Sequence, residues 1–153
     1  MAIRVATLDD LDSIRLLNEE FWQYNARLQP DFYCDATDEG EYPRSVIADA
    51  DADLIIAEEN SFIVGLIHIR ESKTPPYAPI IQKKYAEVID LFVTASHRRK
   101  GVGTALMKAA KEWSNARNLK YIELFVLSEA TGEKRFYESE GFEIASYNMR
   151  IKI

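Results

Sequence analysis

The sequence predicts a mixed α/β sandwich, in which one central sheet of six to seven strands is flanked by about four helices. Two observations lead to this fold class. Short runs rich in Ile, Leu and Val alternate with stretches whose apolar residues recur at helical spacing. The 153 residues are enough to bury one core, and no repeat, low-complexity tract or linker divides them. We therefore expect residues 1–153 to form a single domain with the element order βα(α)βββαβαβ.

The chain should begin with a short edge strand and a long helix. Residues 3–5 alternate apolar and polar side chains, as a strand does. Thr7 can cap a helix, and Asp10 follows at the capping-box position. Apolar residues then recur at helical spacing, so the helix should run from about Leu8 to Arg27.

The next segment, residues 30–53, is acidic and shows little periodicity. A short helix is expected from Tyr42 to Ala50. Because such a long irregular connection is uncommon inside a compact domain, the segment is a candidate functional loop or lid.

The remaining elements follow from changes of period along the chain. The expected strands are Asp53–Glu58, Phe62–Glu71, Tyr85–Val93 and Lys120–Leu127, with a proline-containing loop over residues 72–84. An amphipathic helix should begin at Gly101, and another should cover Thr131–Glu140 and end at Gly141. Phe142–Ile153 should close the sheet as one bent strand or two short ones.

Composition restricts the functions that the chain can have. Hydrophobic residues make up 47% and charged residues 29%, no apolar stretch approaches the ~20 residues of a membrane span, and no secretory signal begins the chain, so a cytoplasmic location is expected. The single cysteine, Cys34, allows no internal disulfide, and no spacing resembles a metal site. The net charge of −6 argues against nucleic acid and favours cationic partners such as amines. We expect no nucleic-acid or membrane partner, and a homodimer stays open.

The residues from Val93 to Thr104 are the most informative segment. A strand runs into a turn, and a helix begins at the glycines, where unpaired N–H groups and the helix dipole favour an anion. Gly101 and Gly103 have no side chains to keep an anion away, and three basic residues precede them. The spacing fits neither a Walker A loop nor a complete dinucleotide fingerprint. These residues alone fit either a phosphate site or a solvated basic turn.

The segment resembles motif A of the GNAT superfamily of N-acetyltransferases, whose signature Q/R-x-x-G-x-G/A matches residues 98–103. Leu91–Val93 matches the preceding L-x-V, and the element order matches the family along nearly the whole chain. The resemblance implies the GNAT acyl-CoA N-acyltransferase fold, with acetyl-CoA as co-substrate and no metal. It assigns the CoA pyrophosphate to the backbone of Arg99–Thr104 and the pantetheine arm to Leu91–Val93. The candidate cofactor-binding residues are Leu91, Phe92, Val93, Arg98, Arg99, Lys100, Gly101, Val102, Gly103, Thr104, Ser128 and Lys134.

A second segment, residues 136–142, resembles the family element F-Y-x-x-x-G-F. By this resemblance Tyr137 protonates, or hydrogen-bonds to, the departing CoA thiolate. A phenol with a pKa of about 10 can serve a thiolate whose thiol has a pKa of about 8–9. Tyr137 also fits an aromatic core residue with a surface hydroxyl. The family often has N-x-x-A where this chain has Ala130 and Glu133, so the asparagine contact to pantetheine is absent, and Ser128 is the candidate replacement.

Transfer to an amine needs a base, because a free alkylamine has a pKa of about 10 and is mostly protonated at neutral pH. Glu87 is the first choice, because a glutamate at the same offset from Arg98, in a similar aromatic-Ala-Glu context, is the base in the histone-acetylating branch of the family. Asp90 is the second choice. In a regular strand these two acids face opposite sides, and a β-bulge would change this. Both acids also fit polar residues at a sheet edge. His68 fits a core histidine and His97 a turn residue.

The resemblance therefore implies an N-acetyltransferase that moves an acetyl group from acetyl-CoA to a primary amine of a small molecule or peptide by direct attack. The amine would enter past the first helix and residues 28–50, where acidic side chains attract cations. The candidate substrate-binding residues are Trp22, Tyr24, Phe32 and Tyr33, which also fit a seal over the core. Two other functions stay open. One is a non-catalytic acyl-CoA sensor, and the other is a nucleotide-binding regulatory domain.

Overall fold

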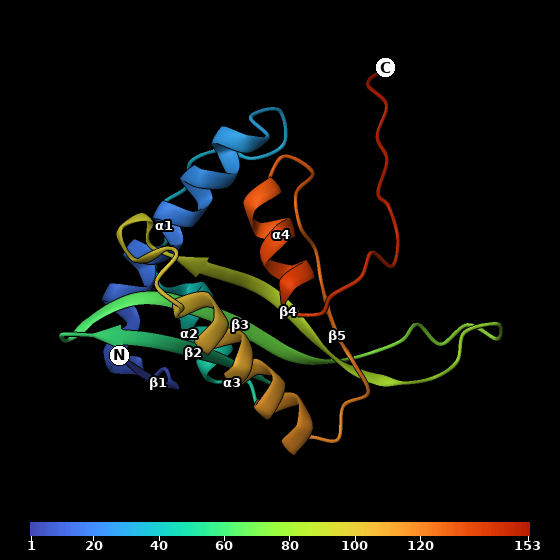
Figure 1. Ribbon diagram of the computed structural model, residues 1–153, viewed down its shortest axis with the longest axis horizontal. Helices are drawn as coiled ribbons and strands as arrows, with labels where there is room; N and C mark the ends of the chain where they lie inside the picture. Colours follow the sequence, from blue (N-terminus) through green and yellow to red (C-terminus); the bar gives the residue numbers. More distant parts are fainter.

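One five-stranded sheet organises the chain, and helices cover both of its faces (Figure 1). The computed structural model describes residues 1–153. The strands follow one another in sequence order across the sheet. The first four pair antiparallel, and β5 pairs parallel to β4. Their bounds are β1 Ala2–Val5, β2 Ala52–Glu59, β3 Phe62–Lys73, β4 Lys84–Val93 and β5 Ile122–Leu124.

Two groups of helices sandwich the sheet. Their bounds are α1 Leu11–Leu28, α2 Glu41–Ile47, α3 Val102–Ala116 and α4 Thr131–Ser139, with single 3₁₀ turns at Leu8–Asp10 and Ala95–His97. The helices α1 and α2 pack on one face, over a core that includes Ile56 and Leu66. The helix α3 and Tyr137 of α4 pack on the other face, over Ile67 and Ile69. Because both faces are covered, the central strands are apolar on both sides.

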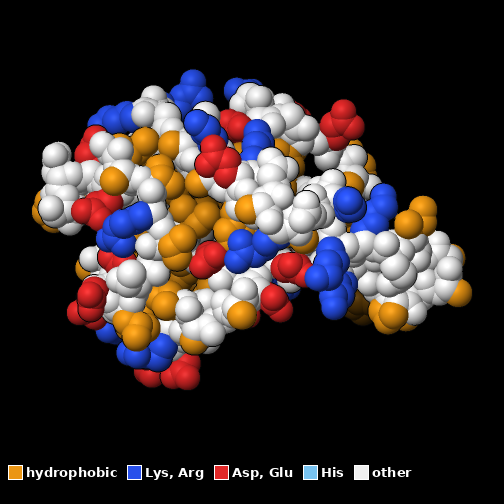
Figure 2. Space-filling view, turned by 90° about the horizontal axis from the view of Figure 1, so that it is seen from below, with side chains coloured by type: hydrophobic (Ala, Val, Ile, Leu, Met, Phe, Trp, Pro, Cys, Tyr) orange, Lys and Arg blue, Asp and Glu red, His pale blue; other side chains and the backbone are white.

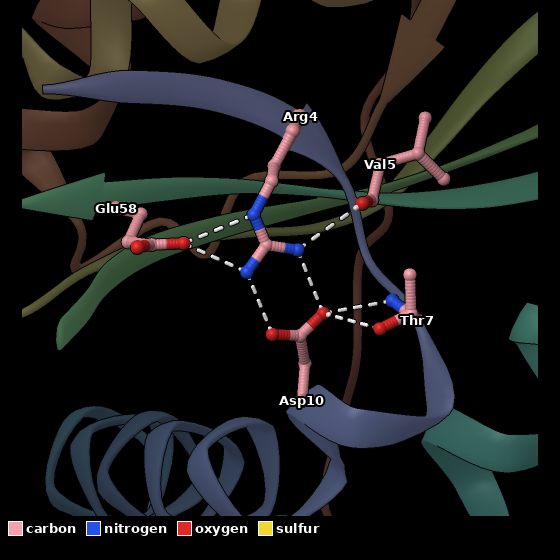
Figure 3. A network of polar contacts seen from close by, with 5 residues as sticks. All are labelled: Arg4, Val5, Thr7, Asp10 and Glu58. Atoms are coloured by element: carbon pink, nitrogen blue, oxygen red, sulfur yellow. Dashed lines mark hydrogen bonds and ion pairs between the residues drawn. The ribbon is translucent and has the colours of Figure 1, made fainter. Parts of the chain in front are cut away.

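An ion-pair network fixes the start of the chain against the sheet (Figure 3). Arg4 of β1 donates to both carboxylate oxygens of Asp10 at 2.8 Å and also to Glu58 of β2 at 2.7 and 2.9 Å. The backbone N–H of Thr7 donates to Asp10 at 2.8 Å, as the capping-box spacing predicts. The network joins β1, β2 and the start of α1.

The loop between β3 and β4 projects from the body as an arm (Figure 1). The space-filling view shows apolar side chains at its end (Figure 2). Tyr77 and Ile81 of this loop are largely exposed. The expected loop over residues 72–84 is therefore present, although β3 and β4 run further into it than predicted.

The expectation of a sixth or seventh strand is wrong. The strand predicted over Lys120–Leu127 is paired only from Ile122 to Leu124. Residues 143–153 are exposed and join no sheet, so the predicted closing strand is absent from this chain's sheet (Figure 1). The alternation of side chains in these residues is local, whereas a strand also needs a partner, which sequence spacing alone does not supply.

None of the helices combines the length and apolar character that crossing a bilayer requires.

Candidate active site

A cleft opens where β4 and β5 part. The two strands pair only from Ala86 to Val88 of β4. Beyond Val88, β4 continues to Val93 with no partner on that side, because β5 ends at Leu124. The space between them is a cleft of about 1020 Å³, which residues of α1 and α4 also line. A cleft of this size suits a ligand larger than a metabolite of a few atoms.

The turn before α3 presents unpaired backbone donors at one side of this cleft. The first helical bond runs from the N–H of Ala105 to the oxygen of Gly101, at 3.0 Å. The N–H groups of Arg99–Thr104 donate to no acceptor in the protein. Arg99 and Gly101 both have positive φ, and Arg99, Gly101, Gly103 and Thr104 line the cleft. A row of free N–H groups at a helix N-terminus is suited to phosphate oxygens.

Two positions of this turn favour glycine, each for a different structural reason. Gly101 has φ of +82°, a conformation that L side chains rarely adopt. Gly103 packs against α4, where an added Cβ would stand 3.3 Å from Cζ of Phe136. Gly103 and Phe136 come from the two sequence segments that resemble one family. The structure thus brings those segments into contact.

Arg98 shapes the cleft rather than extending freely into it. Its Nε donates to the carbonyl oxygen of Val93 at 3.0 Å. Its guanidinium lies over the rings of Tyr24 and Phe92, at 4.9 and 5.5 Å from their centroids. Lys100 is exposed like Arg98 but does not line the cleft.

A buried polar chain ends at Asp90, which lines the cleft. Tyr42 of α2 donates its hydroxyl hydrogen to Asp90 at 2.7 Å and also contacts Nδ1 of His68. This geometry fits a neutral His68 that donates from Nδ1 to the Tyr42 oxygen. Burial lowers the pKa of His68 to about 4, with a smaller contribution from Arg70. Burial raises the pKa of Asp90, and the Tyr42 hydrogen bond partly opposes this rise.

A β-bulge decides which way Asp90 faces. His68 pairs with Asp90 and Ile69 with Val88, so Ile89 has no partner on β3. Val88 packs in the core under α3, whereas Phe92 packs in the core under α1. The extra residue therefore places Asp90 on the same side of the strand as Glu87, although they are three residues apart.

Glu87 lies outside the cleft and is already bound by other side chains. Its Oε2 accepts hydrogen bonds from Nε and Nη2 of Arg70, at 2.8 and 2.6 Å, and from Ser72 at 2.9 Å. A general base must reach the proton that it removes, and this carboxylate is held by Arg70 away from the cleft. The base role predicted for Glu87 therefore stays a prediction, and its surroundings do not favour it.

Tyr137 lines the cleft from α4, and its hydroxyl has no hydrogen-bond partner in the protein. Its ring packs against Phe136 and Phe142. Burial raises the pKa of this phenol above its usual value, and the nearby Glu133 and Asp90 add to the rise. The hydroxyl is therefore protonated at neutral pH and free to donate.

Sequence comparison identifies the family. The model of the Acetyltransferase (GNAT) family matches residues 12–142. The chain belongs to the GNAT acetyltransferases. An uncharacterized N-acetyltransferase of Archaeoglobus fulgidus is 30% identical over 92% of this chain and 91% of its own length. N-acetyltransferase family 8 member 3 of Rattus norvegicus is 24% identical, and the match spans 94% of this chain but only 59% of the rat protein.

Solved structures show the same GNAT fold. A tetramutant of the BH1408 protein of Bacillus halodurans superposes with a TM-score of 0.94, at 22% identity and with all of both chains covered. The aminoglycoside N-acetyltransferase AAC(6′)-Iy, solved in complex with CoA, gives a TM-score of 0.77 at 16% identity, covering 99% of this chain and 98% of its own.

The structure brings only part of the predicted GNAT site together. Among the predicted residues, those that line the cleft are Tyr24, Tyr33, Asp90, Leu91, Phe92, Val93, Arg98, Arg99, Gly101, Gly103, Thr104 and Tyr137. Those that do not line it are Trp22, Phe32, Glu87, Lys100, Val102, Ser128 and Lys134. Val102 is buried in the core, Ser128 donates to Glu129 at 2.8 Å, and the ring of Phe32 lies beneath Arg150.

Sequence reasoning missed several residues of this GNAT site, among them two groups. The first is Tyr42, whose only signal was an aromatic residue in the acidic segment. The second is the wall formed by residues 124–127 and 129–133. Two hydrogen bonds hold this wall to α1, from Tyr24 to Glu133 at 2.6 Å and from Gln29 to Glu129 at 2.7 Å. The partners in these two bonds are 109 and 100 residues apart, so local spacing gave no sign of them.

Proposed function

We propose that this GNAT chain transfers an acetyl group from acetyl-CoA to a primary amine. The observation that carries the proposal is the row of unpaired N–H groups of Arg99–Thr104, which borders the same cleft as Asp90 and Tyr137. The N–H groups suit a diphosphate, Asp90 can accept a proton, and Tyr137 can donate one. CoA contains the diphosphate, and the amine and the thiolate need those two proton transfers.

In the proposed mechanism, acetyl-CoA lies in the cleft with its pyrophosphate on Arg99–Thr104 and its pantetheine arm along Leu91–Val93. The amine nitrogen attacks the thioester carbonyl, whose oxygen is stabilised by a backbone N–H near Val93. The C–N bond forms and the C–S bond breaks. Asp90 takes the proton from the amine, and Tyr137 gives a proton to the sulfur.

We propose Asp90 as the base in preference to Glu87, because Asp90 lines the cleft and Glu87 is bound by Arg70. The raised pKa of Asp90 makes it a stronger base than an exposed carboxylate. Tyr42 holds the carboxylate in place and donates to one oxygen, which leaves the other oxygen for the amine.

The acceptor is proposed to be a cationic amine. Glu133, which accepts from Tyr24, and Glu129, which accepts from Gln29, line the cleft, and the chain carries a net charge of −6. These two acids favour protonated amines, each of which releases one proton to solvent before the neutral amine attacks, so that Asp90 takes only the second proton.

The test is release of free CoA from acetyl-CoA over a panel of amines, including polyamines, aminoglycosides, amino acids and lysine peptides. We expect turnover with at least one cationic class. Calorimetric binding of acetyl-CoA without turnover on any amine would instead indicate an acyl-CoA sensor, and absence of any binding would refute the phosphate site.

The variant Gly103→Glu is expected to abolish CoA binding, because its side chain would put bulk against Phe136 and negative charge beside the pyrophosphate. Calorimetry checks this in a variant whose circular dichroism matches the wild type. Lys108→Glu is the matched control, because Lys108 lies on the same helix but is exposed and does not line the cleft, so its variant should bind CoA within a few-fold of the wild type. If both folded variants bound CoA equally well, the pyrophosphate would have to bind elsewhere.

A further inference from the structure

Three side chains from three elements stand in one row beside the cleft. Tyr42 of α2 lies between His68 of β3 and Asp90 of β4. His68 and Asp90 are register partners on neighbouring strands, yet each contacts the hydroxyl of Tyr42 instead of the other. Asp90 lines the cleft, whereas His68 is buried and does not line it. His68 is therefore connected to the cleft through Tyr42.

The ring of Tyr42 has a fixed place in this row. Helix α2 begins after Gly40, whose N–H donates to the buried carboxylate of Asp38 at 2.7 Å, and Asn18 of α1 donates to the other oxygen of Asp38 at 2.7 Å. The Tyr42 ring packs against the core under α1 and lies edge-on to the His68 ring, with 5.5 Å between their centroids. Only the hydrogen of the hydroxyl is then free to rotate.

A count of hydrogens decides the direction of the two hydrogen bonds. Burial and the carboxylate of Asp90 raise the pKa of Tyr42, so its hydroxyl keeps its one hydrogen at neutral pH. Burial lowers the pKa of His68 to about 4, so its neutral ring also has one N–H hydrogen. If that hydrogen were on Nε2, Nδ1 of His68 and the Asp90 carboxylate would compete for the single hydrogen of Tyr42. With the hydrogen on Nδ1, His68 donates to Tyr42 and Tyr42 donates to Asp90, so both contacts are satisfied.

We propose that His68 is a positioning residue, whose Nδ1–H fixes the hydroxyl of Tyr42 so that Tyr42 donates to Asp90 and leaves the second carboxylate oxygen open to the amine. This inference rests on the proposed function, in which Asp90 is the base. Consecutive hydrogen bonds strengthen one another, so donation by His68 makes Tyr42 a better donor. The Tyr42 hydrogen bond lowers the pKa of Asp90, and loss of the His68 donor should therefore raise that pKa.

The charged groups that act on the row belong to the neighbouring elements. They are Arg70 on β3, Glu87 on β4, and Asp38 and Asp49, which lie on either side of α2. All four are kept in the variants below, so they act equally in each. His68 itself is neutral at neutral pH, so it has no net charge with which to act on Asp90 directly. Its effect on Asp90 is therefore expected to pass through the hydroxyl of Tyr42.

The first experiment locates the hydrogen of His68 directly. The full chain is isotope-labelled in its histidine rings, and nitrogen NMR at neutral pH shows which ring nitrogen carries the hydrogen. Signals that are missing from His68→Asn belong to His68, since His97 is the other histidine of the chain. We expect the hydrogen on Nδ1. A hydrogen on Nε2 would overturn the proposal.

The second experiment compares two variants of nearly equal shape, His68→Asn and His68→Leu. Both new side chains branch at Cγ, but Asn places an N–H donor near the position of imidazole Nδ1, and Leu has no donor. Carbon NMR of the aspartate carboxyl groups measures the pKa of Asp90, whose signal is the one missing from Asp90→Asn. We expect His68→Leu to raise this pKa, and His68→Asn to keep it nearer to the wild type. Equal values in the two variants would contradict the proposal, because the donor would then make no difference.

A double variant tests whether His68 acts through Tyr42. Without the hydroxyl, His68 has nothing to orient, so Tyr42→Phe combined with His68→Leu should give the same pKa of Asp90 as Tyr42→Phe alone. A further shift in the double variant would mean that His68 acts on Asp90 by another route, and the proposal would be wrong. If His68→Leu does not fold, the ring hydrogen of the wild type and an unraised pKa of Asp90 in His68→Asn decide.

These NMR measurements need no acetyl-CoA, so they separate this inference from the proposed function. In kinetics, the acidic limb of kcat/KM should move to higher pH in His68→Leu, by less than in Tyr42→Phe, and His68→Asn should restore it toward the wild type. A limb that does not follow the measured pKa of Asp90 would instead refute Asp90 as the base, which is a failure of the proposed function.

Discussion

At the scale of single residues, Asp90 and Glu87 show how surroundings separate two similar acids. Both are carboxylates of β4 on the same side of the strand. Glu87 accepts three hydrogen bonds from Arg70 and Ser72, outside the cleft. Asp90 accepts one from Tyr42 and lines the cleft. The two acids therefore differ in which groups donate to the carboxylate and in whether the carboxylate lines the cleft.

Asp90→Asn is therefore expected to lower kcat about 100-fold or more, because loss of a general base typically costs that much. The affinity for acetyl-CoA should be unchanged. Glu87→Gln is the matched control and should lower kcat far less. Steady-state kinetics and calorimetry measure both quantities. If Glu87→Gln lowered kcat more than Asp90→Asn, the base would be Glu87.

Tyr42→Phe should shift the pH dependence of the reaction. The Tyr42 hydrogen bond lowers the pKa of Asp90, so its removal should raise that pKa. The base works only when deprotonated, and the acidic limb of kcat/KM should therefore move to higher pH. A pH profile of variant and wild type tests this. An unmoved limb would mean that Asp90 does not govern it.

At the scale of elements, the network around Asp10 holds β1, β2 and α1 together. Hydrogen bonds from Arg4 lower the pKa of Asp10 to about 2. Because the folded pKa lies below the unfolded value, the stabilisation is complete above about pH 4 and is lost as the pH falls toward 2.

Asp10→Asn should lower the free energy of unfolding by about 1–2 kcal/mol at neutral pH, since charged hydrogen bonds are lost. Urea titration measures this, and the difference from the wild type should shrink toward pH 2. Asp9→Asn, an exposed neighbour, is the control. A difference that does not change with pH would show that the charge of Asp10 is not the cause.

Elements defined by their own residues could be predicted from the sequence, whereas those that depend on distant partners could not. The period of side chains gave α1, α3, α4 and the strands β2 to β4 nearly at their observed bounds. The turn before α3 is contiguous, so the sequence pattern marked its residues together. The extent of β5, the isolation of residues 143–153 and the contact of Tyr42 with Asp90 each depend on a second segment far away in sequence.

At the scale of the whole molecule, a buried histidine connects the pH to global stability. His68 is buried and its pKa falls to about 4, whereas the unfolded chain binds this proton below about pH 6.5. Between these values the unfolded chain binds more protons, so stability should decrease as the pH falls from about 6.5 to 4.

Protonation of this one group lowers the free energy of unfolding by at most about 3 kcal/mol. Urea titrations at several pH values measure it, and most of the window lies above the range where carboxylates titrate. His68→Gln should flatten the slope between pH 6.5 and 5 relative to the wild type. Equal slopes in the wild type and His68→Gln would contradict this origin.

The unpaired residue Ile89 has a further consequence for the molecule as a whole. The pairing of β4 with β5 stops at Val88, directly before the bulge. Bulges bend and twist the strand that carries them, so this one turns the rest of β4 away from its neighbour. In a chain lacking Ile89, side chains would alternate along β4 without interruption. The strands β4 and β5 could then stay side by side to their ends. A single surplus residue thus stands where a continuous pair of strands gives way to an open cleft.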